Sequence, residues 1–518
     1  MTGPAAPAAA PRTSRGLGLV VALVTVAVFL RGLGGEFLNW DDAASFVENP
    51  HYRGLGPAQL RWMFTTFHMG LYMPFTWITL GLDYLLWGMN PWGYHATSLA
   101  LHGATTFAFY AVALRLLRLA MPGTAEPDLR LGAAAAALLW SLHPLRVESV
   151  AWITERRDVL SGFFYLAAIL AYLRSTGAED AGRHRWYWGA LGLFTGALLS
   201  KSITVTLPVV LLVLDVYPLR RLGGERGWRD RRVWLEKLPF FALACAAAVL
   251  AFTANSSLSN RPSWSDMGPG VRLVLSIYGF VFYLQKTLLP LGLSPLYPLD
   301  VHVTWLHFAA VLVWAALALA LRRRWPAFTA VSLVYAVTLL PVSGLFQNGM
   351  QAAADRYSYL ACLGWALLGG AAVARRWTGT RVVRVVAALW LAALAALAWQ
   401  QTGVWRDSVT LWRHALTVNS LSRAAHFNLG GAYEGQGRFA EAVAEYYAVL
   451  RLSGNQEYWH ITIGWAWEKA GMDRRALEAF REALRLHPGL PDACAGVKRV
   501  SERMKVSPEG LSGCPPGG

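Results

Sequence analysis

Charged residues are scarce in this chain, and their scarcity decides its broad class. Only 15% of the 518 residues are Asp, Glu, Lys or Arg, whereas 55% are hydrophobic, and the mean hydropathy is +0.35. An average soluble domain carries about 25% charged residues. The composition therefore excludes an ordinary soluble protein and predicts an integral membrane protein with about eleven spans.

Cysteine and the short motifs of metal and nucleotide sites are also lacking. Four cysteines give no disulfide framework. Cys245 and Cys362 lie in apolar runs, whereas Cys494 and Cys514 could pair if the C-terminus lies in an oxidising compartment. The chain has no HExxH motif, CxxC cluster or P-loop, so neither zinc nor ATP is implied. No cofactor is assigned, and a divalent metal at the carboxylates stays open.

Positive charge is plentiful, with a net charge of +16, but it is not gathered into one patch. It falls in short loops between apolar runs, which is the positive-inside pattern of membrane proteins rather than a nucleic-acid surface. We therefore expect these loops, and a tail at 1–16, to be cytoplasmic, with the first apolar run a retained signal anchor. The basic loop residues are Arg220, Arg221, Arg226, Arg229, Arg231, Arg232, Arg322, Arg323, Arg324, Arg375, Arg376, Arg381 and Arg384.

Apolar runs of membrane length fill residues 17–400 and predict an all-α polytopic helix bundle. Residues 270–290 break the alternation of the loops, so this segment is either re-entrant or interfacial, or an earlier hairpin is misassigned. The predicted spans are 17–35, 94–118, 131–150, 159–174, 187–200, 203–219, 236–254, 303–321, 325–343, 357–374 and 380–400.

Two adjacent carboxylates follow the first span, in the motif Asn39-Trp40-Asp41-Asp42. They begin a long predicted outer loop, 36–94, that is rich in aromatic residues. Carboxylates so close to hydrocarbon are costly, so a functional role is the first hypothesis. The alternative is that Asp41 caps a short interfacial helix beginning near Ala43.

The chain changes character after residue 400, where a 34-residue period begins. Ile463-Gly464 and Ala476 repeat the pattern of Leu429-Gly430 and Ala442. Small and large residues at this period are typical of TPR helix pairs. We predict a half-repeat and two TPR repeats over 401–504, followed by a disordered tail at 505–518.

The ordered motifs resemble one family as a set, across nearly the whole chain. They resemble the transmembrane-and-TPR protein O-mannosyltransferases and their prokaryotic relatives, which are GT-C glycosyltransferases that use polyprenyl-phosphate sugars. The TPR tail is shorter than the arrays of eukaryotic members. The motifs are Asn39-Trp40-Asp41-Asp42, Asn90-Pro91-Trp92-Gly93-Tyr94-His95, His143-Pro144 with Glu148-Ser149-Val150-Ala151-Trp152, and Ala354-Asp355-Arg356-Tyr357-Ser358-Tyr359.

The resemblance implies a catalytic role for Asp41 and Asp42, one of which would act as base; we favour Asp41. Cationic side chains would bind the donor phosphate. The alternative role of these cationic side chains is structural: they would snorkel to the membrane interface or form ion pairs, for example Arg356 with Asp355. His143 is expected to cap a turn rather than bind metal, and Glu148 could pair with Arg146. The phosphate candidates are Arg146, Arg156, Arg157, Lys201, Lys286 and Arg356, and the supporting polar residues are His143, Glu148, Asp158, Asp355 and Tyr357.

The resemblance implies an inverting, polyprenyl-phosphate-sugar-dependent membrane glycosyltransferase acting at the outer or lumenal face. Its partners would be the lipid-linked donor, a protein or glycan acceptor, and a protein bound by the TPR repeats. It would lie in a bacterial inner membrane with a periplasmic TPR domain, or in the endoplasmic reticulum with a lumenal one. The alternatives are a non-catalytic TPR membrane scaffold for envelope or complex assembly and a lipid-linked-sugar transporter, although a transporter should carry its polar breaks near the midplane.

Overall fold

A computed structural model describes residues 12–177, 179–223, 227–256, 268–345, 351–376, 381–507 and 514. The chain divides into two compact units. Met1–Glu36 and Ala44–Arg406 form the first, which we call the membrane unit. Phe37–Ala43 and Asp407–Gly518 form the second, which we call the repeat unit.

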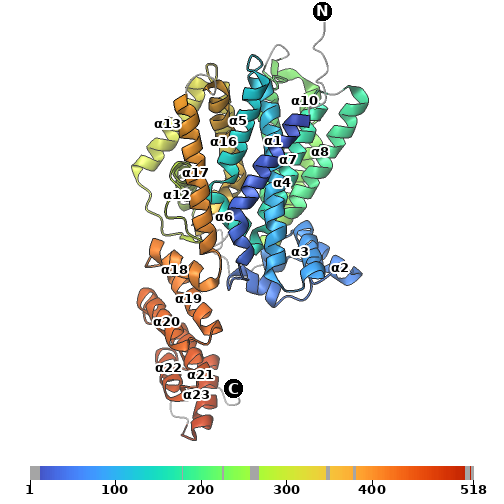
Figure 1. Ribbon diagram of the computed structural model, residues 1–518. Coiled ribbons are helices and arrows are strands. Elements are labelled where there is room, and N and C mark those ends of the chain that lie inside the picture. The colour runs from blue at the N-terminus through green and yellow to red at the C-terminus, as the bar shows by residue number, and fades with distance from the viewer. Residues whose placement is uncertain are drawn as a thin grey trace, which may run out of the picture. The chain divides into compact units, whose positions relative to one another are not determined.

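The membrane unit is almost entirely helical, as the sequence predicts (Figure 1). Among the described residues, its strands are two short segments, β1 (Tyr297–Pro298) and β2 (Gln351–Ala353), which pair antiparallel. Its helices of nine or more residues are α1 (Arg12–Phe29), α2 (Pro57–Thr65), α3 (Pro74–Trp87), α4 (Pro91–Ala120), α5 (Glu126–Ser141), α7 (Arg156–Ser175), α8 (Asp180–Ser200), α9 (Leu207–Val216), α11 (Leu238–Ser256), α12 (Pro269–Leu288), α13 (Trp305–Leu321), α14 (Pro326–Leu339), α16 (Leu363–Arg376) and α17 (Arg381–Val404).

Several of these helices are long and apolar enough to cross a membrane, which confirms an integral membrane protein. Five described helices meet this criterion, and a sixth span is gained if the bent pair Asp355–Ala361 and Leu363–Arg375 counts as one. The ambiguous run 270–290 forms the single helix α12. The other predicted spans also coincide with helices, several of them shorter or broken. The five are Arg15–Gly34, Pro91–Ala120, Ile153–Ser175, Arg231–Ser256 and Arg384–Val404.

Three breaks in the helices matter for function. Between α5 and α7 the chain forms only short turns, η4 (Pro144–Arg146), α6 (Val147–Ala151) and η5 (Ile153–Glu155). Pro144 favours the first break, since a residue before proline is pushed into the extended region, and His143 has φ −69° and ψ 133°. Similar breaks follow α8 at Lys201 and follow β2 at Ala354. Irregular backbone at membrane depth persists only where protein or a cavity surrounds it.

The ends of the membrane unit differ in what they carry. Figure 1 shows α2 and α3 at one end of the helix bundle and the short helix α10 (Arg231–Leu235) at the other. Helices α2 and α3 of the aromatic loop therefore lie at the opposite end of the membrane unit from α10 of the basic loop.

The repeat unit is built from helices that pack in consecutive pairs. Gly430 and Gly464, one predicted period apart, occupy equivalent contacts: a Cβ there would lie 2.4 Å from Tyr446 and 2.6 Å from Phe480, respectively. Only glycine lets each helix approach its partner so closely. The helices are α18 (Ser408–Val418), α19 (Arg423–Gly435), α20 (Phe439–Ser453), α21 (Glu457–Lys469), α22 (Asp473–Leu486) and α23 (Pro491–Met504).

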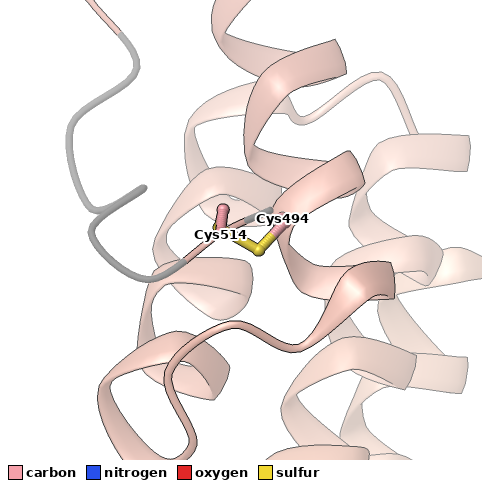
Figure 2. Close-up of a disulfide and its surroundings, with 2 residues drawn as sticks. All are labelled: Cys494 and Cys514. Atoms are coloured by element: carbon pink, nitrogen blue, oxygen red, sulfur yellow. A yellow bond between two sulfur atoms is a disulfide. The ribbon is translucent and has the colours of Figure 1, made fainter. Parts of the chain in front are cut away.

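A disulfide closes the end of the repeat unit. Cys494 of α23 bonds to Cys514, and their Cα atoms are 5.9 Å apart (Figure 2). The pairing that the sequence allowed is therefore present in the structure. Most of the tail predicted to be disordered, 508–513 and 515–518, lies outside the described residues.

The division into units differs from the predicted domains at one informative point. The segment Phe37–Ala43, which carries Asp41 and Asp42, was assigned to the membrane domain as part of its first outer loop. The structure groups it with the helices after Arg406. The reason is its side-chain contacts with α18 and α19, which sequence proximity to the first span does not reveal.

Candidate functional site

The three helix breaks of the membrane unit bring their charged side chains together around one carboxylate. Glu155 of η5 lies 2.5 Å from Nη2 of Arg157, 2.8 Å from Nζ of Lys201 and 3.1 Å from Nε of Arg356. We call Glu148, Glu155, Arg157, Asp158, Lys201 and Arg356 the Glu155 cluster. Its three cations come from three separate segments, so the cluster exists only when the bundle is assembled.

Two further carboxylates complete the cluster. Asp158 accepts from Lys201 at 2.7 Å and from the Ser149 hydroxyl at 3.0 Å. Glu148 forms an ion pair with the Arg356 guanidinium and accepts from the Arg356 backbone N–H at 2.8 Å. All three carboxylates are almost completely buried. A buried ionic network is costly unless each charge is paired, so the pairing explains how the network survives inside the protein.

Several buried N–H donors around the cluster nevertheless make no hydrogen bond with the described residues. Within the cluster they are Nη1 of Arg157 and Nε of Arg356; in the adjoining segments they are Nη1 of Arg156 and both Nε and Nη1 of Arg146. Buried donors are almost always satisfied in native proteins, and exceptions often mark binding sites. Guanidinium N–H groups pair readily with phosphate oxygens. The orphaned donors therefore fit an anionic group that is absent from the protein alone.

Arg146 is the most conspicuous of these cations. It is fully buried, and no ion pair joins it to a carboxylate within the described residues. Its Nη2 donates to the Ser358 hydroxyl at 2.5 Å. Its charge lies 5.8 Å and 5.5 Å from the ring centres of Trp140 and Tyr359, which gives partial cation–π stabilisation. The alternative in which Glu148 pairs with Arg146 is therefore wrong, because Glu148 pairs with Arg356.

The remaining predicted residues lie around the cluster in distinct roles. Asp355 does not pair with Arg356, as the alternative reading proposed; it accepts from the Tyr297 hydroxyl at 2.9 Å. Burial, together with the charge of Asp355, raises the pKa of Tyr297 well above its usual range, so Tyr297 remains a neutral donor. Tyr357 accepts from the Gln351 side chain at 3.1 Å.

Arg156, His143 and Lys286 have local partners. Arg156 pairs with Asp83 of α3 at 2.7 Å and donates to the Ser98 hydroxyl at 2.8 Å. His143 Nδ1 accepts from the Leu145 N–H, which confirms the turn-capping role. Lys286 donates to the carbonyl oxygen of Leu291 at 2.6 Å. Among the described residues, no group of three or more His, Cys, Asp or Glu side chains could hold a metal ion.

Asp41 and Asp42 belong to the repeat unit and differ in exposure. Asp42 is fully buried, and its Oδ2 accepts from the backbone N–H of Leu38 at 3.0 Å. Asp41 is only partly buried. The geometry gives Asp42 a structural role in the segment and leaves Asp41 as the more accessible carboxylate.

Sequence reasoning missed the hub of the cluster. Glu155 is absent from the residues that the sequence singles out, because nothing in the local sequence distinguishes it from Glu148 or Asp158. Asp83 was also passed over in the aromatic loop. One feature of the sequence could have identified Glu155. Two acidic and two basic residues, Glu155-Arg156-Arg157-Asp158, stand together at the start of an apolar helix, where ionisable residues usually have a function.

The fold and site define a class: a polytopic α-helical membrane protein with a buried ionic centre and a helical-repeat unit. No protein-family model matches the chain. It is similar to the protein O-mannosyl-transferase Tmtc3 of Drosophila melanogaster, with 24% identity over 85% of this chain and 54% of that protein. The mouse protein O-mannosyl-transferase TMTC4 is 26% identical, over 83% of this chain and 65% of that protein.

These relatives confirm the resemblance to the transmembrane-and-TPR protein O-mannosyltransferases that the motifs indicate. The chain spans about half to two-thirds of the length of the curated relatives it matches. Among solved structures it is similar to ArnT from Cupriavidus metallidurans bound to undecaprenyl phosphate. That match covers 93% of this chain and 82% of the other, with 15% identity and a TM-score of 0.38.

Proposed function

We propose that the protein is a membrane glycosyltransferase that moves a sugar from a polyprenyl-phosphate donor to an acceptor hydroxyl. The observation that carries the proposal is the Glu155 cluster with its orphaned guanidinium donors. Buried arginines with unsatisfied N–H groups destabilise a membrane protein, and a bound anionic ligand would offset this by pairing with those groups. The names of the relatives, all protein O-mannosyl-transferases, make a mannosyl lipid the first donor to test.

The roles of the residues follow from this reaction. The acceptor oxygen attacks the anomeric carbon, whose bond to the phosphate oxygen breaks with the electron pair going to the phosphate. Arg157, Arg146 and Lys201 would stabilise the negative charge that develops on this leaving group. Asp41 would take the proton of the acceptor hydroxyl. Direct displacement of this kind inverts the anomeric configuration.

The disulfide supports the predicted side of the membrane. Structural disulfides persist in oxidising compartments and are rare in the cytosol. The Cys494–Cys514 bond therefore favours a periplasmic or lumenal repeat unit. A hydroxyl-bearing protein or glycan in that compartment would be the acceptor, and the repeat unit offers a surface for a protein partner.

Transfer by purified full-length protein in lipid nanodiscs tests the function. Polyprenyl-phosphate mannose with a radiolabelled sugar is the donor, and serine- and threonine-containing peptides or glycans are the acceptors. We expect wild-type protein to release polyprenyl phosphate and Asp41→Asn to lose transfer while inserting normally. Asp128→Asn at the start of α5 is the matched carboxylate control. Full activity of a well-folded Asp41→Asn variant would refute the assignment of the base.

A further inference from the structure

Asn39 ties the segment Phe37–Ala43 to the helices of the repeat unit through three hydrogen bonds. Its Oδ1 accepts from the indole N–H of Trp412 at 2.8 Å. Its Nδ2 donates to the carbonyl oxygen of Asn428 at 2.7 Å. Its backbone N–H donates to the Ser408 hydroxyl at 2.9 Å. Asn39 therefore contacts both α18 and α19, which lie more than 360 residues later in the chain.

The chemistry of these contacts requires an amide at position 39. Trp412 is completely buried, and its indole N–H can only donate, so it needs an acceptor. The Asn428 carbonyl can only accept, so it needs a donor. Asparagine supplies both from one short side chain, whereas aspartate lacks the donor and alanine lacks both. The adjacent Trp40 packs against the Trp412 ring, with 5.1 Å between centroids.

The same segment carries the proposed base two residues later. Asp42 stabilises the local turn of the segment, because its side chain accepts a hydrogen bond from the Leu38 N–H. Between these two anchors, Asn39 and Asp42, the position of Asp41 is set by the repeat unit. A helical-repeat array that only recruited an acceptor would need no such connection to the first outer segment.

We propose that Asn39 is a positioning residue through which the repeat unit sets the conformation of Asp41, so that turnover of the donor itself depends on the repeat helices. This inference rests on the proposed function for its assignment of Asp41 as base. It changes the expected role of the repeats, which become part of the catalytic apparatus in addition to any acceptor they recruit.

The test compares variants of the full-length protein in nanodiscs, with polyprenyl-phosphate mannose as the donor. Asn39→Ala removes both amide contacts, and Trp412→Phe removes only the indole N–H. We expect each to lower kcat about tenfold or more, because small displacements of a reacting group are costly. The KM for the donor should stay close to wild type. Because each variant leaves a buried polar group without its partner, the melting temperature should fall, and kcat is therefore measured per folded molecule, well below the melting temperature. Arg499→Gln, which breaks the ion pair with Glu468 in the last repeat helices, is the control and should retain wild-type kcat.

The double variant shows whether the two side chains act as one unit. Because Asn39 and Trp412 share a hydrogen bond, the kcat of the double variant should be no lower than that of the worse single variant. The milder variant Ser408→Ala, which removes the third contact, should lower kcat in the same direction. It keeps the question answerable if Asn39→Ala fails to fold.

The failures of the inference and of the proposed function are distinguishable. Wild-type kcat in both Trp412→Phe and Ser408→Ala would overturn the inference, while an inactive Asp41→Asn would leave the proposed function intact. Lost activity that disappears when kcat is expressed per folded molecule would also overturn it, because Asn39 would then act only on stability. An active Asp41→Asn would contradict the proposed function directly, whatever Asn39 does.

Discussion

Two ionic clusters with buried centres lie at opposite ends of the same helix of the membrane unit, α7, and they are built differently. The Glu155 cluster uses Asp158 near the start of α7. The second, which we call the Asp215 cluster, uses Tyr172 near its end. Fourteen residues separate these positions, which is about 21 Å along a helix. The Asp215 cluster consists of Tyr172, Arg183, Asp215, Arg221, Glu236 and Lys237.

The Asp215 cluster is saturated. Asp215 accepts from the Tyr172 hydroxyl and pairs with Lys237, each at 2.7 Å, and pairs with Arg221 at 3.0 Å. Glu236 pairs with Arg221 at 2.6 Å and also with Arg183. In the part of the chain that the structure describes, none of the buried polar atoms of this cluster lacks a hydrogen bond.

The Glu155 cluster is bordered by unsatisfied donors instead. An unpaired buried donor costs about 1–3 kcal/mol, so a purely structural network would be expected to resemble the Asp215 cluster. The difference teaches that burial and charge alone do not mark a functional site. Under the proposed function, hydrogen-bond saturation would separate the cluster that stabilises the bundle from the one that binds the donor phosphate.

The largest expected effect is that of Glu155→Gln. The variant deprives Arg157, Lys201 and Arg356 of their common carboxylate, and breaking a buried pair in this way costs about 3–5 kcal/mol. We expect a clear fall in melting temperature together with loss of transfer. Thermal unfolding in nanodiscs and the transfer assay measure the two effects. Normal stability would show that Glu155 is not the hub of the cluster.

Asp215→Asn is the counterpart in the saturated cluster. It leaves Lys237 and Arg221 without their shared carboxylate, so a destabilisation of the same order, about 3–5 kcal/mol, is expected. The rate of transfer per folded molecule should nevertheless stay within about twofold of wild type. The reason is that the substitution removes no contact with the substrate, in either its ground state or its transition state. A selective loss of activity would make the Asp215 cluster functional and break the comparison.

Arg146→Gln should separate activity from stability. A charge-assisted hydrogen bond to phosphate contributes about 1.5–3 kcal/mol, so transfer should fall by about 10- to 100-fold. Stability should stay equal or increase, because the variant removes a buried charge without breaking an ion pair among the described residues. A large fall in melting temperature with unchanged transfer would assign Arg146 to the scaffold.

The smallest effect is expected at a more exposed ion-pair triad, in which Glu126 pairs with Arg118 and Arg130. The hydrogen bond from Arg118 lowers the pKa of Glu126, and Arg130 lowers it further. The triad therefore stabilises the protein above the unfolded pKa of about 4.3, and its contribution is lost as the pH falls below that value. Solvent screening limits the effect of Glu126→Gln to about 1 kcal/mol or less at pH 7. Thermal unfolding at pH 7 and pH 4 checks it; an equal difference at both pH values would contradict the ionic origin.

Much of the fold could be predicted because apolar runs and turn residues act locally. The long helices α4 and α7 follow directly from runs of membrane length, and Pro144 marks the break before Glu148. The helix pairs of the repeat unit follow from a period that recurs in the sequence. These features depend on neighbours within a few tens of residues.

The site could be predicted only as a set of candidates, because its pairings join distant segments. Arg356 follows Asp355 in sequence but pairs with Glu148, more than 200 residues earlier. A helical turn directs adjacent side chains apart, so adjacency misleads. Asn39 is the clearest case: its motif was recognised, but its partners on α18 and α19 become visible only in the folded chain.

Binding of sugar-free polyprenyl phosphate tests most directly whether hydrogen-bond saturation separates the two clusters. Arg157→Gln and Arg221→Gln are matched, since in each case the carboxylate partners keep another cation: Glu155 keeps Lys201, and Glu236 keeps Arg183. With purified protein in nanodiscs, Arg157→Gln should raise the Kd for polyprenyl phosphate about tenfold or more, and Arg221→Gln should leave it unchanged. Equal affinity in wild type and Arg157→Gln, or an equal loss in both variants, would contradict the account.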